Sequence, residues 1–192
     1  MAFELLSIGV TQIDPDLLEQ AAGIALRQWP QRVPIDPVDE AERRISDAQA
    51  YDGPEEKRPM VHVVIESGTA IAVATTLERV IGTEVGQMSI LALSGVVVEP
   101  DRRGEGLGKA VVQAAFNRVD QGVFGFSLYQ TEPKNLGFYE GLGARQVHNE
   151  IVNSLETPDM NMPVFNPGEL VIVYPDKPGW PEGTIDLLGP GY

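Results

Sequence analysis

The segment 96–112 holds the residues best suited to binding an anion. An apolar run ends at Pro100, glycines follow at positions 104, 106 and 108, and an amphipathic stretch comes next. Glycine lets the main chain approach a ligand without interference from a Cβ atom. The first amides of a helix lack intrahelical acceptors and carry a partial positive charge, which suits a phosphate. Three basic side chains add charge to this segment: Arg102, Arg103 and Lys109.

Two common glycine-loop motifs do not fit this segment. A P-loop needs a glycine five residues before its Gly-Lys pair and a Ser or Thr after it, but Gly108-Lys109 has Arg103 and Ala110 at those positions. The dinucleotide fingerprint G-x-G-x-x-G, started at Gly104, would need a third glycine where Lys109 stands. The pattern that remains is R-x-x-G-x-G, formed by Arg103, Gly106 and Gly108.

This pattern resembles the acetyl-CoA pyrophosphate loop of the GNAT superfamily of N-acetyltransferases. Two neighbouring features are similar to that family: the strand ending in V-x-x-P before the loop, and Phe138–Gly143, which is similar to its second signature, F-Y-x-x-L-G. The resemblance covers about residues 60–145. We expect this motif core to belong to a single acyl-CoA N-acyltransferase domain over residues 1–192.

The resemblance implies acetyl-CoA as co-substrate, no metal, and main-chain contacts along the strand and the loop. The pantetheine arm would pair with the main chain of Val96, Val97 and Val98 like an added strand. Such pairing needs a splayed sheet edge, and the isolated Gly95 is a reasonable place for a bulge. The pyrophosphate cradle would be Arg103, Gly104, Glu105, Gly106, Leu107 and Gly108, with the Glu105 amide serving and its side chain pointing to water.

By the same resemblance, Tyr139 is the general acid that protonates the departing CoA thiolate. A phenol with a pKa of about 10 is protonated at neutral pH and can pass its proton to a thiolate. Two positions depart from the family. Glu132 stands where many members carry Asn, so we expect Asn135 to contact the cofactor instead. Ser94 stands near the position of an acidic base and cannot remove an ammonium proton, so the base must come from elsewhere or act through water.

The C-terminus resembles the aminoglycoside 2′-N-acetyltransferase branch, in which the chain also ends in an aromatic residue whose carboxylate reaches the active site. Tyr192 is that residue here, so we expect its carboxylate to be catalytic, with Glu84 as the alternative base. The expected reaction is direct acetyl transfer to a primary amine of a cationic small molecule. A peptide or protein N-acetyltransferase and a non-catalytic acyl-CoA-binding module remain alternatives, and the acyl chain length and oligomeric state stay open, a homodimer being one option.

Hydrophobic periodicity predicts the elements that would position these residues. Helices are expected over 15–28, capped by Asp14 and ended by Pro30, and over 37–50, 105–119 and 133–142, the last ending at Gly143. Strands are expected over 61–66 and 70–77, which form a hairpin with His62 on its solvated face, and over 88–98, 124–130 and 169–175. We expect strand 88–98 to be central and buried on both faces, and strand 169–175 to be an edge strand.

The fold class is therefore α/β (α+β), with a GNAT-like mixed, mostly antiparallel central sheet flanked by helices. Composition narrows the function further. The chain contains no cysteine and two histidines, which argues against disulfide scaffolds, thiolate metal sites and an acetyl-cysteine intermediate. Its net charge of −14 disfavours nucleic acid as a partner. No apolar run is long enough to span a membrane and no secretory signal is visible, so we expect a cytoplasmic protein without a membrane partner.

Overall fold

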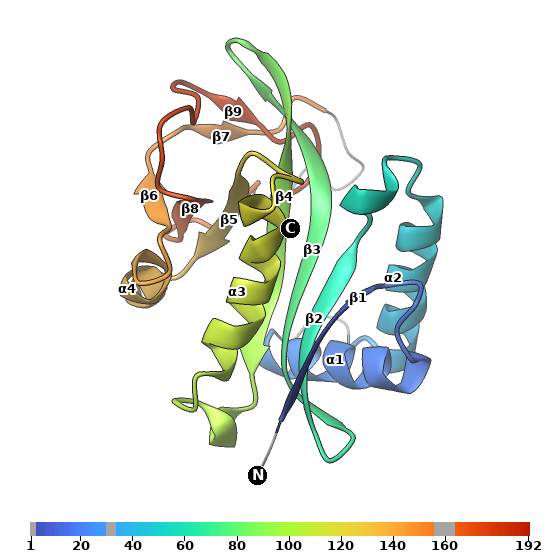
Figure 1. The fold of residues 1–192 in the computed structure, drawn as a ribbon. Coiled ribbons are helices and arrows are strands. Elements are labelled where there is room, and N and C mark those ends of the chain that lie inside the picture. Colours follow the sequence, from blue (N-terminus) through green and yellow to red (C-terminus); the bar gives the residue numbers. More distant parts are fainter. Residues whose placement is uncertain (1–2, 30–33, 156–163) are drawn as a thin grey trace. The chain divides into compact units, whose positions relative to one another are not determined.

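The computed structural model describes residues 3–29, 34–155 and 164–192. The chain divides into two compact units: unit 1 comprises Met1–Leu77 and Leu93–Asn117, and unit 2 comprises Glu78–Ala92 and Arg118–Tyr192. Two long strands, β3 (Thr69–Thr83) and β4 (Gly86–Val98), contribute to both units (Figure 1). That residues 1–192 act as one domain stays a prediction.

Unit 1 begins its helical part with α1 (Pro15–Gln28) and α2 (Pro37–Ala50), at the predicted bounds. The Asp14 carboxylate accepts hydrogen bonds from the amides of Asp16 and Leu17, and Asp36 caps α2 in the same way through the Val38 amide. Each helix therefore starts with a side-chain cap followed by proline, a combination that local sequence alone specifies. Pro30, the expected end of the first helix, lies outside the described residues.

The sheet of unit 1 runs in the order β1 (Glu4–Gly9), β2 (Met60–Glu66), β3 and β4. The sequence analysis does not assign β1. Both β1–β2 and β2–β3 are antiparallel. The hairpin between β2 and β3 turns through Ser67 and Gly68, whose φ angles of 52° and 79° match a turn with two left-handed central residues. The predicted hairpin is confirmed, and β3 extends beyond its predicted end.

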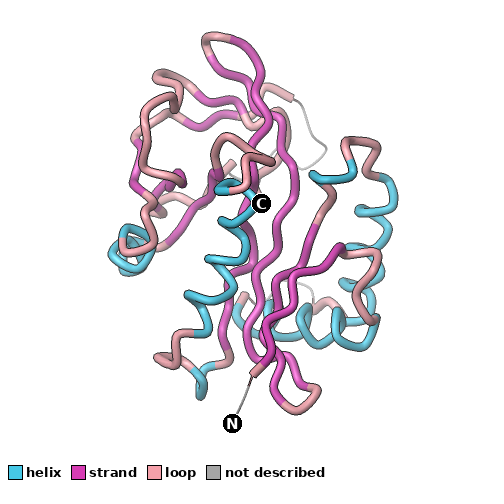
Figure 2. The backbone as a smooth tube through the Cα atoms, viewed as in Figure 1, coloured by secondary structure: helices cyan, strands magenta, loops and turns pink. Residues whose placement is uncertain are grey.

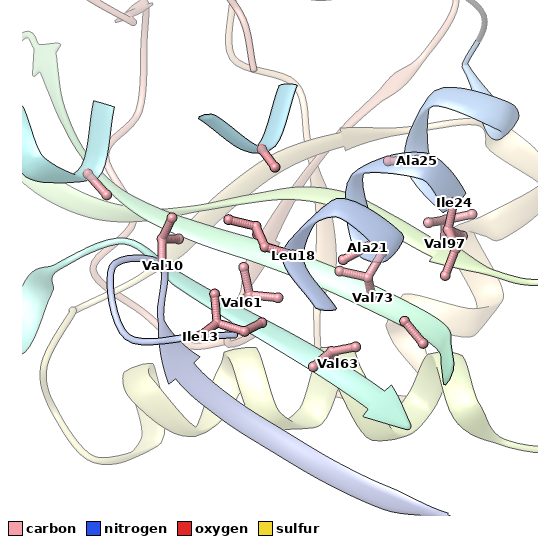
Figure 3. Close-up of a cluster of buried hydrophobic side chains, with 13 residues drawn as sticks. Val10, Ile13, Leu18, Ala21, Ile24, Ala25, Val61, Val63, Val73 and Val97 are labelled. Carbon is pink, nitrogen blue, oxygen red and sulfur yellow. The ribbon is translucent and has the colours of Figure 1, made fainter. Parts of the chain in front are cut away.

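The core of unit 1 forms where α1 packs on β2 and β3 (Figure 3). Leu18, Ala21 and Ile24 of the helix are buried with Val61 and Val63 of the strand. Residues of alternate parity point to the other face, and four of them are fully buried too: His62, Val64, Ala72 and Ala74. On that side of the strands lies α3 (Leu107–Asp120), as Figure 3 shows.

His62 thus contradicts the prediction of a solvated side chain. Its ring is fully buried, with Nδ1 2.9 Å from the Ser7 hydroxyl and Nε2 3.1 Å from the Thr76 hydroxyl. The alternation correctly places His62 on the face of the strand opposite to Val61 and Val63. That face is also buried, because another element covers it. Hydroxyl partners on both neighbouring strands make the burial of the imidazole tolerable.

Unit 2 builds its sheet from shorter strands. The order is β4, β5 (Ser127–Thr131), β8 (Leu170–Tyr174) and β6 (Arg145–Val147), while β9 (Ile185–Asp186) pairs with β3 and with β7 (Ile151–Val152). The predicted edge position of 169–175 is wrong: β8 pairs with β5 on one side and β6 on the other. The short helix α4 (Leu136–Glu140) follows a 3-10 turn, Pro133–Asn135, inside the predicted helical range.

The fold class is as predicted: a mixed, mostly antiparallel sheet flanked by helices (Figure 2). The pairings β4–β5 and β7–β9 are parallel, whereas β1–β2, β2–β3, β5–β8 and β6–β8 are antiparallel. Among the described residues, no helix has the length and apolar character that crossing a membrane requires.

Candidate active site

Strand β4 departs from regular geometry where the sequence analysis expects a bulge. Gly95 has a φ of 62°, a left-handed value that glycine adopts without strain. The strand is buried from Ile90 to Leu93 and partly exposed from Ser94 to Val96. The expectation of burial on both faces therefore holds for the middle of the strand and not for residues 94–96.

The glycine loop leads from β4 into α3. Gly104 and Gly106 have φ angles of 87° and 82°, and a Cβ atom at either position would meet no heavy atom within 4 Å. The Gly106 carbonyl accepts the Ala110 amide at 3.1 Å, so the helical hydrogen bonding begins inside the loop. The loop surface is therefore open to a ligand, with the first amides of α3 beside it.

Arg103 folds back from this loop onto the end of β4 in the structure. Its Nε donates to the Val98 carbonyl at 3.3 Å and its Nη2 donates to Gln28 Oε1 at 2.8 Å. Beside this contact lies a pocket of about 160 Å³. It is lined by Ile24, Arg27, Gln28, Val97, Val98, Glu99, Pro100 and Arg103. Arg103 therefore occupies one of the two acceptor positions of the Val98 carbonyl oxygen.

Arg102 is engaged by two carboxylates of the same unit. Its guanidinium lies 2.6 Å from Glu66 and 2.8 Å from Glu105. Hydrogen bonds from Arg102 lower the pKa of both carboxyl groups, and these bonds in turn raise the pKa of Arg102. The Glu105 side chain is exposed, as expected, and it also binds Arg102. Arg103 and Lys109 remain as the other cations of the loop segment.

Tyr139 lies in α4 and is buried, with 6% of its surface exposed. Burial raises the pKa of its phenol to about 12, and a hydrogen bond with Thr131 opposes this shift. The Thr131 hydroxyl also accepts the Asn135 side-chain amide at 3.2 Å. The structure thus links Tyr139 and Asn135 through Thr131. The phenol is held in its protonated form, the form a general acid needs.

Tyr192 is anchored within unit 2. Its hydroxyl donates to the Leu128 carbonyl on β5 at 2.8 Å, and its ring meets Phe165 edge-on with the centroids 5.7 Å apart. Arg79 places its guanidinium 5.9 Å from the ring centroid and donates to the carbonyls of Leu187 and Pro190. The Tyr192 side chain is therefore held by several contacts.

Two glutamates of unit 2 bear on the search for a base. Glu84 is exposed in the turn between β3 and β4, with its carboxylate packed against Gly183. Glu78 on β3 is partly buried and accepts the Ser89 hydroxyl at 2.5 Å. The sequence analysis missed Glu78, because only the pairing of β3 with β4 brings Ser89 to it.

The predicted residues fall into two groups. Val96, Val97, Val98 and residues 103–108 belong to unit 1, whereas Asn135, Tyr139 and Tyr192 belong to unit 2. Within the described part of the chain, no group of three or more His, Cys, Asp or Glu side chains is arranged to hold a metal ion. The functional roles of these residues stay predictions.

The order of strand, glycine loop and helix agrees with a comparison of the sequence with known families. A family model described as the acetyltransferase (GNAT) family matches residues 19–144. The chain belongs to this GNAT family. No curated protein sequence matches this GNAT protein. GNAT acetyltransferases use acetyl-CoA, and the fold implies acyl-CoA-dependent N-acetylation, so the protein is an acyltransferase by family.

Solved structures with the same fold include several acyltransferases. An acetyltransferase from Trypanosoma brucei is 19% identical, with a TM-score of 0.57, over 81% of this chain and 100% of that chain. Glucosamine-6-phosphate N-acetyltransferase from Arabidopsis thaliana is 17% identical, with a TM-score of 0.58, over 83% and 100%. An acyl-CoA N-acyltransferase from Pseudomonas aeruginosa is 12% identical, with a TM-score of 0.60, over 90% and 99%. At these identities the likeness concerns the fold alone.

Proposed function

We propose that this GNAT protein transfers an acetyl group from acetyl-CoA directly to the primary amine of a cationic small molecule. The observation that carries the proposal is the open loop at the start of α3, where Gly104 and Gly106 hold left-handed φ angles and leave the main chain uncovered. Such a loop offers helix amides to a pyrophosphate without steric hindrance. It lies inside the segment that matches the family.

The donor would be held mainly by main-chain groups. Residues 103–108 would cradle the pyrophosphate, and Arg103 would exchange its contacts with Gln28 and Val98 for a phosphate oxygen. The freed Val98 carbonyl, with Val96 and Val97, would then pair with the pantetheine amides. Asn135 would contribute a further contact. Because guanidinium–phosphate bonds are charge-assisted, this exchange favours the bound state.

The chemistry needs two proton transfers. The neutral amine nitrogen attacks the thioester carbonyl carbon, the new C–N bond forms, and the C–S bond breaks with its electron pair on sulfur. Main-chain amides of the irregular part of β4 would polarise the carbonyl oxygen. Tyr139 would give its phenolic proton to the thiolate and later recover one from solvent.

The proton of the incoming ammonium group must go to a base. We propose the terminal carboxylate of Tyr192, because the anchored side chain limits the positions that this carboxylate can take. Glu84 is the alternative from sequence, and Glu78, held by Ser89, is the alternative from structure. Substitution of each glutamate by glutamine separates these three candidates.

The acceptor class rests on charge. The net charge is −14, which favours a cationic ligand near the protein surface and disfavours a polyanion such as nucleic acid. The likeness of the tail to aminoglycoside 2′-N-acetyltransferases suggests an aminosugar with several amines. A peptide acceptor is the competing class, and a homodimer stays one option for the assembly.

The test is thiol release from acetyl-CoA with a panel of amines: aminosugars, polyamines, amino acids and peptides with free N-termini or lysines. We expect turnover with cationic small molecules. Turnover with peptides alone would shift the assignment to a peptide N-acetyltransferase. Tight CoA binding without acetylation of any amine would leave a binding module, and absence of CoA binding would refute the proposal.

A further inference from the structure

Three polar residues follow one another along a short segment of unit 2. Thr131 ends β5, Asn135 ends the 3-10 turn that follows, and Tyr139 lies in α4. The Asn135 main-chain amide donates to the Glu132 carbonyl at 2.9 Å, which closes the turn. The positions of these three side chains relative to one another therefore depend on one continuous piece of local structure.

The Thr131 hydroxyl group is shared between the other two residues. Thr131 and Tyr139 are both buried. The Asn135 Nδ2 donates to Thr131 Oγ1 at 3.2 Å, and a hydrogen bond joins the Thr131 hydroxyl to the Tyr139 phenol. A hydroxyl group carries one hydrogen, and an amide nitrogen cannot accept it. Between these two partners, the Thr131 hydrogen is therefore directed at the Tyr139 oxygen.

The electrostatic effect of this bond agrees with that direction. The bond with Thr131 lowers the pKa of Tyr139, against the larger effect of burial. A hydrogen bond donated to an oxygen favours its charged form, whereas a bond that uses the phenolic hydrogen would favour the neutral form. The Tyr139 oxygen is thus the acceptor, and its own hydrogen is not used in the bond with Thr131.

This arrangement suits a residue that has to lose its proton. In the proposed transfer, the Tyr139 O–H bond breaks, an S–H bond forms on the leaving thiol, and the electron pair stays on the phenolate oxygen. A buried phenolate is costly because water is excluded from it, so it needs a donor from the protein. The Thr131 hydroxyl is such a donor and is in place before the transfer.

We propose that Thr131 is a positioning residue for the general acid: it donates to the Tyr139 oxygen, leaves the phenolic hydrogen for the thiolate, and stabilises the phenolate that remains. Asn135 sets the direction of the Thr131 hydroxyl by donating to its oxygen. This inference rests on the proposed function, in which Tyr139 is the acid. Thr131 keeps its own proton throughout, and Tyr139 recovers one from solvent.

The first measurement compares two substitutions of Thr131. Thr131→Val removes the hydroxyl at nearly constant shape, and we expect kcat to fall about tenfold or more, as for a lost hydrogen bond to a charged group. The KM for acetyl-CoA should stay within about a factor of two, since the bond gains strength only as the phenolate forms. Thr131→Ser keeps a hydroxyl and should retain most of kcat. Thr76→Val is the matched control: Thr76 is also buried, and its hydroxyl lies 3.1 Å from His62 Nε2. Its kcat should equal that of the unchanged protein.

A double-mutant cycle distinguishes this role from a general effect on folding. In Tyr139→Phe there is no phenolic oxygen to accept the bond, so adding Thr131→Val should lower kcat no further, within about a factor of two. A purely structural role of Thr131 would lower kcat by the same factor in both backgrounds, and that result would overturn the proposal.

NMR gives a readout that does not depend on activity. With tyrosine labelled at Cζ, the Tyr139 resonance, identified from its loss in Tyr139→Phe, should move in Thr131→Val and return in Thr131→Ser. If Thr131→Val does not fold, Asn135→Asp replaces it, because a carboxylate accepts the Thr131 hydrogen and draws it away from Tyr139. A resonance that stays in place overturns the proposal.

The outcomes separate this proposal from the proposed function. If Tyr139→Phe lowers kcat and Thr131→Val does not, the positioning role of Thr131 fails and the acid remains. If Tyr139→Phe leaves kcat unchanged, or if no amine is acetylated, the proposed function fails and the role of Thr131 fails with it.

Discussion

The rings of Tyr139 and Tyr129 pack against each other with their centroids 4.8 Å apart and their planes inclined by 55°. Phe138 meets Tyr139 edge-on, with the centroids 4.9 Å apart. This aromatic surround removes water from the phenol and is the physical origin of its raised pKa. It also fixes the ring, so the hydroxyl group has a defined position relative to Thr131.

Replacing Tyr139 by Phe removes the proposed acid and preserves the ring packing. We expect kcat to fall by about 100-fold or more, the range typical for a lost general acid, with little change in the KM for acetyl-CoA. Steady-state kinetics of thiol release measure both. Tyr174→Phe is the control: its hydroxyl donates to Asp120 at 2.5 Å, and its loss should leave kcat within about a factor of two. Equal kcat in Tyr139→Phe and the unchanged protein would remove Tyr139 from the mechanism.

The pH dependence of kcat/KM should reflect the buried phenol. Because burial raises the pKa of Tyr139 from 10.0 to about 12, the acid stays protonated beyond the pH at which an exposed tyrosine loses its proton. We therefore expect no loss of activity from Tyr139 near pH 10 in the free enzyme. The unfolded state binds the proton less tightly, so this group lowers folding stability as the pH rises from 10.0 to about 12. A fall in kcat/KM near pH 10 that is present in the unchanged protein and absent in Tyr139→Phe would contradict this expectation.

Substituting Gly106 by Ala tests the glycine loop. The new Cβ meets no neighbour within 4 Å, but a φ of 82° strains any other residue by about 1–2 kcal/mol. We expect the dissociation constant of CoA to rise about tenfold, because the loop distorts or the Cβ intrudes on the ligand. Gly122→Ala carries the same strain, with a φ of 80° and an equally open site, outside the loop. Isothermal titration with CoA should show normal affinity for that control; equal affinity in both variants would count against the cradle.

Arg79 is expected to hold the C-terminal tail. Changing it to Gln removes the bonds to Leu187 and Pro190 and should lower the free energy of unfolding by about 1.5–3 kcal/mol, the range for hydrogen bonds to charged groups. Urea denaturation measures this change. Arg58→Gln serves for comparison, because Arg58 pairs with the exposed Glu55 and such surface pairs contribute about 0–1 kcal/mol. If Arg79→Gln lost no more free energy of unfolding than Arg58→Gln, Arg79 would not be holding the tail.

The carboxylates around Arg102 predict a response to acid. Hydrogen bonds from Arg102 place the pKa of Glu66 and of Glu105 below 4.5 in the folded state. Their contribution to stability is therefore present above pH 4.5 and is lost as the pH falls through the lower folded values. Melting temperatures of the unchanged protein and of Arg102→Gln should differ at neutral pH and converge in acid. A difference that persists at about pH 2 would assign the effect to packing instead.

Local signals explain which elements the sequence predicts well. Asp14 followed by Pro15 starts α1 whatever the helix later packs against, because cap and proline act within one turn. The glycines at 104 and 106 predict an open loop for a similar reason, since their left-handed φ angles are a local property. The GNAT motifs are such local patterns, and the family that they indicate is confirmed by the family model.

Partners far apart in the chain explain what the sequence analysis misses. β8 looks like an edge strand by its prolines and turns, yet it is internal because β6 pairs with its second edge. His62 looks solvated by its alternation, yet it is buried because a second layer covers that face. The sequence of a strand does not indicate which distant segment will pair with its edge or pack on its face.

By itself, the sequence determined the starts of α1 and α2, the open glycine loop and the family, because each depends on residues within a few positions of one another. Only the tertiary structure decided that the Tyr192 hydroxyl binds Leu128, 64 positions earlier, and that Glu78 accepts the Ser89 hydroxyl. Strand pairing and the anchoring of a tail depend on which distant segments meet. A local sequence pattern indicates which secondary structure a segment can form, and tertiary packing decides which long-range contacts that segment makes.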